Sequence, residues 1–183
     1  MRAHRLLGLA IAVGAGSRAL AQDAPPADPD LPMLYQVTAE IATAAQPSSE
    51  GLAKLKLRGY RAVMDLRLEA EGALEERLVV ENLGMEFVHV PIREIDAQGV
   101  ERFAKALREA PRPLLIHGAS GQRVGALWLI DRVLQGAPLA EARAEAETIG
   151  LTDPNLMRKA LVFIQQHRRG AASQPAAVAS EPP

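Results

Sequence analysis

Apolar and polar positions fall in blocks along the chain that predict strands alternating with helices. Three short apolar segments ending in polar residues indicate buried strands at residues 61–66, 85–90 and 113–117. A further short strand is expected within residues 35–44. Apolar residues at helical spacing predict six helices. The first begins at Ser48 or Ser49 and ends at Gly59. The others are expected at residues 69–82, around 100–107, at 123–134, at 139–148 and from Pro154 onward.

This alternation predicts one α/β domain with a central, mostly parallel sheet and helices on both faces. Ligands of such sheets bind at the carboxyl ends of the strands. The residues that follow the predicted strands are Asp65-Leu66-Arg67, His89-Val90-Pro91 and His117-Gly118. We therefore expect a functional site where these three segments meet.

Both ends of the chain differ from its middle. The first 21 residues have the pattern of a signal peptide, which predicts a periplasmic or secreted protein. The pattern consists of basic residues, an uncharged segment from Leu6 to Ala15 and the sequence Ala19-Leu20-Ala21. An amphipathic first helix is the alternative. The apolar segment is too short to span a membrane. Residues 22–32 are expected to form a linker, 33–169 the folded domain and 170–183 a disordered tail rich in Ala, Ser and Pro.

Composition excludes several kinds of chemistry. The 183 residues carry a formal net charge of −1, which does not favour a nucleic-acid partner. The chain has no cysteine, so disulfides, thiolate metal sites and a cysteine nucleophile are excluded. The four histidines lack the spacing of a metal motif. We expect no metal and no cofactor.

The segment from Leu114 to Trp128 carries the clearest functional signal. A buried strand runs into a loop of small residues, Gly118 to Gln122, and then into a helix. Successive backbone N–H groups in such a loop can converge on an oxyanion, and Arg123 at the helix start can add a bidentate contact. Alternatively, His117 is a buried residue bonded to the loop backbone, and Arg123 pairs with Asp65 or a glutamate.

Other polar residues have simpler interpretations. Asp65 and Arg67 are expected to be structural, with ligand binding as the alternative for both and a surface charge after the strand as a further alternative for Arg67. Trp128 is expected in the core, and the charged helix at 69–82 should present a solvated face.

Several short motifs in this chain resemble a known group of enzymes. They are Gln46-Pro47-Ser48, Asp65-Leu66-Arg67, His89-Val90-Pro91 and above all the segment from His117 to Trp128. Together they resemble the cysteine-dependent tyrosine and dual-specificity protein phosphatase superfamily, in particular the bacterial β-lactamase-hydrolase-like phosphatase domain. The resemblance implies a phosphatase-like fold and a phosphate-binding loop made of His117, Gly118, Ala119, Ser120, Gly121, Gln122 and Arg123.

One position departs from that family pattern. The family loop reads His-Cys, four residues, then Arg, and Gly118 stands where the nucleophilic cysteine is expected. Without a side chain at Gly118 no covalent phosphoenzyme can form there. Ser120 is the only nearby hydroxyl and lacks an obvious base. The order of the family's elements leaves Glu94 and Asp96 as equal candidates for a remnant general acid.

These observations favour a secreted pseudophosphatase that binds a phosphate-type anion, a phosphorylated molecule or a protein partner without turnover. The resemblance implies a phosphoric-monoester hydrolase, and the missing cysteine argues against that activity. Two alternatives stay open: a hydrolase that uses Ser120 or a water with Glu94 or Asp96, and a rhodanese-like relic. A further alternative is an interaction module whose pocket is unused, and the sequence alone does not distinguish it from a pseudophosphatase that binds a ligand.

Overall fold

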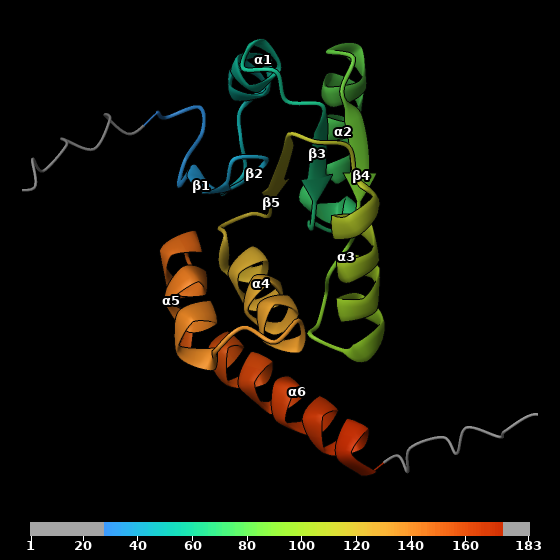
Figure 1. Ribbon diagram of the computed structural model, residues 1–183. Coiled ribbons are helices and arrows are strands. Elements are labelled where there is room, and N and C mark those ends of the chain that lie inside the picture. Colours follow the sequence, from blue (N-terminus) through green and yellow to red (C-terminus); the bar gives the residue numbers. More distant parts are fainter. Residues whose placement is uncertain (1–27, 174–183) are drawn as a thin grey trace, which may run out of the picture.

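The computed structural model describes residues 28–173, in which a five-stranded sheet lies between two helical layers (Figure 1). The strands are β1 (Tyr35–Thr38), β2 (Ile41–Ala44), β3 (Ala62–Asp65), β4 (Glu86–His89) and β5 (Leu114–His117), in the order β1-β2-β5-β3-β4. β1 is antiparallel to β2, and the other four strands are mutually parallel. The predicted α/β fold with a mostly parallel sheet is confirmed.

The helices follow the strands as the hydrophobic pattern predicts. They are α1 (Ser49–Leu57), the 3₁₀ turn η1 (Glu69–Glu71), α2 (Ala73–Asn82), α3 (Ala97–Glu109), α4 (Gln122–Leu134), α5 (Leu139–Ile149) and α6 (Pro154–Ser173). The Ser48 hydroxyl accepts the Gly51 N–H at 3.0 Å, which caps α1. None of the helices within residues 28–173 combines the length and apolar character needed to cross a membrane.

Alternate residues of the central strands enter two separate cores. Val63 and Leu115 pack on one face of the sheet with residues of α1 and α2. Met64 and Ile116 pack on the opposite face with residues of α3, α4, α5 and α6. This division follows from the two-residue period of a strand, because both faces of a parallel sheet must be covered.

α4 is the central helix of the larger layer. Nine of its 13 residues are buried, including Trp128, which is 4% exposed. Helices α5 and α6 lie against it, as Figure 1 shows. An almost continuous apolar sequence is what a helix enclosed on all sides requires. The start of α4 is therefore held rigidly against the end of β5.

Two predicted elements are divided in the structure. Residues 35–44 form two strands, because the Thr38 hydroxyl accepts the backbone N–H groups of Glu40 and Ile41 and closes a turn. The predicted helix at 69–82 is split into η1 and α2 at Gly72, whose φ of +86° belongs to the left-handed region that glycine adopts readily. The turn changes the direction of the chain before α2.

The predicted ends of the chain lie mainly outside the described residues. The signal peptide, most of the linker and residues 174–183 belong to these parts. Within the described part of the linker, Leu31 is 1% exposed, and Asp28 and Asp30 each pair with Lys54 at 2.8 Å. The predicted tail boundary at residue 170 falls inside α6.

Candidate functional site

The loop between β5 and α4 lies at the carboxyl end of the sheet. His117, the last residue of β5, is in register with Ala44 of β2 on one side and with Asp65 of β3 on the other. Residues 118–121 therefore leave the sheet at its centre, beside the ends of two parallel strands. This is the position expected for a ligand site in such a fold.

The backbone N–H groups of this loop are not used inside the protein. Within residues 28–173, no hydrogen bond starts from the amides of Gly118 to Gln122. Gly121 begins α4 with a φ of +71°, and a β-carbon there would lie 2.9 Å from the Ile149 carbonyl oxygen. Glycine is therefore needed at this position for both conformation and space. The turn and the helix start leave a series of unpaired donors at one end of α4.

Arg123 is fixed along one edge of its guanidinium group. Nη1 donates to the carbonyls of Leu66 and Ile92, each at 3.1 Å, and to Glu71 Oε2 at 2.8 Å. Nη2 donates to Glu71 Oε1 at 2.7 Å. The hydrogen bonds from Arg123 are the main cause that lowers the pKa of the Glu71 carboxyl, and the hydrogen bond from the Leu68 N–H lowers it further. The expected pairing of Arg123 with a glutamate is therefore present, and Asp65 is not that partner.

The other edge of Arg123 lies beside Gly118. A β-carbon built on Gly118 would be 4.0 Å from Arg123 Nε and 4.0 Å from a methyl group of Val124. Among the described residues, Nε makes no hydrogen bond. The Nε edge and the loop amides therefore offer donors next to the same glycine.

Four charged or titratable residues form a buried network beneath the loop. Arg67 is 1% exposed and donates from Nη2 to Asp65 Oδ2 at 2.9 Å and to Glu76 Oε2 at 2.8 Å. Arg67 is thus structural, and the alternative of a surface charge is wrong. Glu76 of α2 is also buried, so the predicted solvated face of residues 69–82 is interrupted. The left-handed Gly72 separates α2 from η1, and Glu76 lies in the first turns of α2 with its carboxylate buried.

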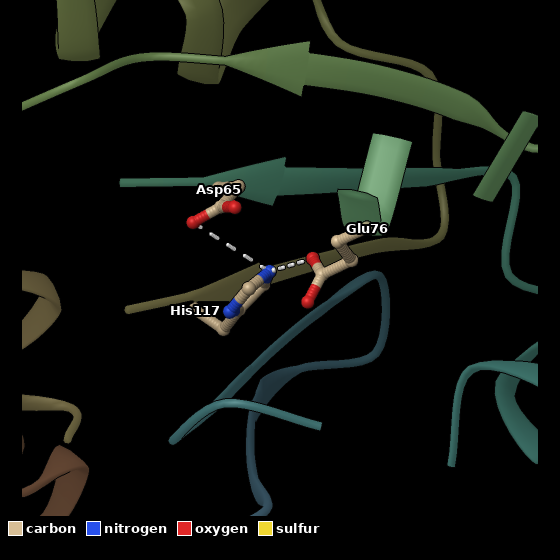
Figure 2. A group of neighbouring side chains, drawn as sticks. All are labelled: Asp65, Glu76 and His117. Carbon is tan, nitrogen blue, oxygen red and sulfur yellow. Dashed lines mark ion pairs between the residues drawn. The ribbon is translucent and has the colours of Figure 1, made fainter. Parts of the chain in front are cut away.

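His117 belongs to this network and not to the loop's hydrogen bonding. Its Nε2 lies 2.6 Å from Glu76 Oε1 and 3.9 Å from Asp65 Oδ1 (Figure 2). Despite the short distance, the His117–Glu76 contact lacks the angles of a hydrogen bond, and both ring nitrogens are without a partner in the described structure. The expected bond from His117 to the loop backbone is therefore wrong, because the ring points under the sheet end toward α2.

The remaining predicted site residues have separate roles. Glu94 pairs with Lys159 at 2.7 Å, and Asp96 caps α3 by accepting the Gly99 N–H at 2.6 Å. Gln122 turns to the start of α6, where its Oε1 accepts the N–H groups of Thr152 and Asp153. Ala119 and Ser120 are exposed on the loop. The structure brings neither acid candidate into hydrogen bonding with the loop, so the general acid stays a prediction.

Glu71 and Glu76 are the site residues that sequence reasoning missed. Each lies in a charged segment whose other glutamates are exposed, and neither has a motif that distinguishes it. Arg123 and Glu71 are 52 positions apart. Only the Asp65-Leu66-Arg67 motif directly before them signalled that this segment approaches the strand ends.

Comparison with known proteins agrees with this fold. The family model described as DSP-PTPase phosphatase fused to NAD⁺ kinase matches residues 34–162. The β-lactamase hydrolase-like protein of Xylella fastidiosa is 24% identical over 124 residues, which make up 64% of this chain and 28% of that protein. The chain thus spans little more than a quarter of the length of the curated relative it matches.

Solved structures share the arrangement of strands and helices. A candidate phosphatase from Shewanella putrefaciens CN-32 superposes with a TM-score of 0.62 at 17% identity, covering 76% of this chain and 91% of that one. P. aeruginosa TpbA, as a cysteine-to-serine variant in complex with phosphotyrosine, gives a TM-score of 0.58 at 21% identity, covering 77% and 91%. At these identities the likeness establishes the fold.

Proposed function

This chain belongs to the family of DSP-PTPase phosphatases fused to NAD⁺ kinase, and on that premise we propose that it is a phosphatase-like protein that binds a phosphate-type anion without turnover. The observation that carries the proposal is the combination of unused donors beside Gly118. The amides of Gly118 to Gln122 and the Nε edge of Arg123 have no partners among the described residues.

Electrostatics support an anion in this loop. The first turn of a 13-residue helix carries a partial positive charge, and its amides point out of the helix end. Arg123 adds a full charge, and Glu71 holds one edge so that Nε and the second hydrogen of Nη2 can form a bidentate contact. Because the arginine is already oriented, anion binding requires little ordering of that side chain.

Gly118 accounts for the proposed lack of turnover. We place it at the position of the family's nucleophilic cysteine, and glycine supplies no atom that can attack phosphorus. The site has space for a larger residue, since a β-carbon there would make only ordinary contacts at 4.0 Å. The backbone at Gly118 is also outside the left-handed region. A cysteine should therefore fit without rearrangement.

Anion binding can be tested by calorimetry with phosphate, vanadate and a phosphotyrosine peptide. We expect Arg123→Ala to weaken binding by about tenfold or more, because a charge-assisted bidentate contact contributes roughly 1.5–3 kcal/mol. Arg77→Ala is the matched control, since Arg77 is an exposed arginine paired only with Glu81. Undetectable binding to the wild-type protein, or equal losses in the two variants, would reject the proposal.

The absent nucleophile is tested by Gly118→Cys. We expect this variant to hydrolyse an aryl phosphate, with a stoichiometric burst from the phosphoenzyme, while the wild-type protein does not. The double variant Gly118→Cys with Arg123→Ala should lose the gain. Hydrolysis by the wild-type protein would instead favour a cysteine-independent hydrolase, and Ser120→Ala, Glu94→Gln and Asp96→Asn would then identify its groups.

Export is the second part of the proposal. It is supported by the order of basic residues, apolar segment and Ala19-Leu20-Ala21 near the start of the chain. Expression of the full chain in a Gram-negative host should release a product that begins at Gln22 into the periplasmic fraction. An uncleaved protein in the cytoplasmic fraction would contradict this part and leave the binding proposal unaffected.

A further inference from the structure

The buried network beneath the loop contains one excess negative charge when His117 is neutral. Asp65 and Glu76 supply two carboxylates, and Arg67 supplies one guanidinium that contacts both. Asp65, Arg67 and His117 are at most 1% exposed, and Glu76 is 8% exposed. Burial of an uncompensated charge is costly, so a further positive group would stabilise the network.

The hydrogen-bond pattern indicates where that positive group lies. Arg67 binds the Oε2 atom of Glu76, whereas Glu76 Oε1 has no hydrogen-bond partner. His117 Nε2 lies 2.6 Å from this oxygen and 3.9 Å from Asp65 Oδ1 (Figure 2), and it also has no hydrogen-bond partner among the described residues. Two fully buried ligand atoms therefore face each other without a hydrogen between them in a bonding position.

A proton on His117 would not satisfy the pattern. An imidazolium carries N–H groups on both ring nitrogens, and neither Nδ1 nor Nε2 has an acceptor at hydrogen-bonding angles. Leaving both donors buried and unpaired costs more than leaving one. A neutral ring with its Nε2 lone pair toward a cation leaves only the Nδ1 hydrogen unpaired.

We propose that Asp65, Glu76 and His117 bind a divalent transition-metal cation, with Zn²⁺ as the best match. Their three ligand atoms lie within 4.8 Å of one another. One nitrogen and two carboxylate oxygens suit zinc, whose ligands lie about 2.0–2.2 Å away. The 3.9 Å between His117 Nε2 and Asp65 Oδ1 is within reach of one such ion, and the 2.6 Å contact with Glu76 would open by several tenths of an ångström.

A cavity on the α2 side lies next to one of the three ligands. A cavity of about 280 Å³ is lined by Gln46, Ser48, Ser49, Glu75 and Glu76 among other residues. Glu76 thus borders this cavity, whereas its Oε1 atom is fully buried behind the cavity wall. The second carboxylate on this wall, Glu75, is exposed and would face an entering cation. Bound metal would hold His117 directly before Gly118 and so stiffen the start of the loop.

The proposal is tested with Zn²⁺ on the untagged, chelator-treated full chain by calorimetry and thermal unfolding. We expect one Zn²⁺ per chain, a raised unfolding temperature and weaker binding at pH 5 than at pH 7, because the ligating histidine must be neutral. Glu76→Gln should weaken binding by roughly tenfold or more. The matched control, Glu75→Gln on the same helix and cavity wall, should change it less than about twofold.

Crystals of the wild-type protein soaked in Zn²⁺ provide a second measurement that does not depend on the folding of Glu76→Gln. An anomalous peak between Asp65, Glu76 and His117 would support the site. A peak only at another histidine, no binding at equimolar concentration, or equal affinities of the two glutamine variants would overturn it. Phosphate binding by the loop is measured separately, so failure of the metal site leaves the proposed function to its own test.

Discussion

The carboxylate of Glu71 holds the guanidinium of Arg123 with both oxygens, at 2.8 Å from Nη1 and 2.7 Å from Nη2. The same carboxylate accepts the Leu68 N–H at 2.7 Å, so it also stabilises the 3₁₀ turn in which it lies. One side chain thereby links the segment after β3 to the start of α4. The orientation of Arg123 depends on this contact between segments far apart in sequence.

Glu71→Gln should reduce stability modestly at neutral pH and make it less sensitive to acid. The ion pair is partly exposed, so we expect a loss of about 1 kcal/mol or less at pH 7. Arg123 lowers the pKa of Glu71 below its ordinary value of 4.5. The pair therefore stabilises the fold above that value and loses this effect as pH falls through the lowered pKa.

Urea unfolding at pH 7 and between pH 5 and 3 measures this effect. The matched control is Glu81→Gln, which removes an exposed pair with Arg77 on α2. An unchanged acid response in Glu71→Gln would mean that the Glu71–Arg123 pair contributes nothing to the free energy of unfolding.

Arg67→Met should be severely destabilising. It removes the guanidinium that contacts the buried carboxylates of Asp65 and Glu76. Loss of one partner from a buried ion pair typically costs about 3–5 kcal/mol, because the remaining charge stays desolvated. Denaturant unfolding is the measurement, with Arg77→Met as a surface control expected within about 0.5 kcal/mol of the wild type. A cost below 1 kcal/mol would show that the network relaxes or is neutralised without Arg67.

Gly121→Ala should cost more than Gly136→Ala, although both glycines have positive φ angles. A β-carbon at Gly121 would meet the Ile149 carbonyl at 2.9 Å, whereas nothing lies within 4 Å of one at Gly136. We expect about 1 kcal/mol for Gly136→Ala from backbone strain alone. Overpacking should add a further 1–3 kcal/mol at Gly121. Equal unfolding free energies would indicate that α5 moves away from the loop without cost.

Asp131→Asn should stabilise the protein at pH 7. Burial in α4 raises the pKa of Asp131 above its ordinary value of 3.8. The protonated form is therefore favoured in the fold, and this stability is present below pH 3.8 and lost as pH rises through the raised pKa. Asparagine stays neutral and can still accept the Gln135 side-chain N–H that now bonds Asp131 at 2.7 Å.

We expect a gain of about 0.5–1 kcal/mol for Asp131→Asn at pH 7. The gain should disappear at pH 3.5, where Asp131 is itself protonated. Thermal unfolding at both pH values provides the measurement, and a variant less stable than the wild type at pH 7 would show that Arg108 or Arg132 depends on the charge.

The sequence by itself determined the alternation of strands and helices, the α/β class and the loop after the strand predicted at residues 113–117. These features depend on local patterns: apolar runs in β3 and β5, the Ser48 cap of α1 and the small residues from Gly118 to Gly121. The sequence alone also establishes that the chain has no cysteine. Local patterns suffice here because each element's own residues decide its period and its ends.

Only the tertiary structure decided which charges meet. Glu71 and Glu76 have the same composition around them as the other glutamates of this segment, yet Glu71, before Gly72, pairs with Arg123, and Glu76, after Gly72, contacts His117. The break between η1 and α2 and the burial of Glu76 set these partners, and neither leaves a periodic signal in the sequence. Contacts between distant segments arise from packing of both sheet faces, which is why the buried network under the loop became visible only in three dimensions.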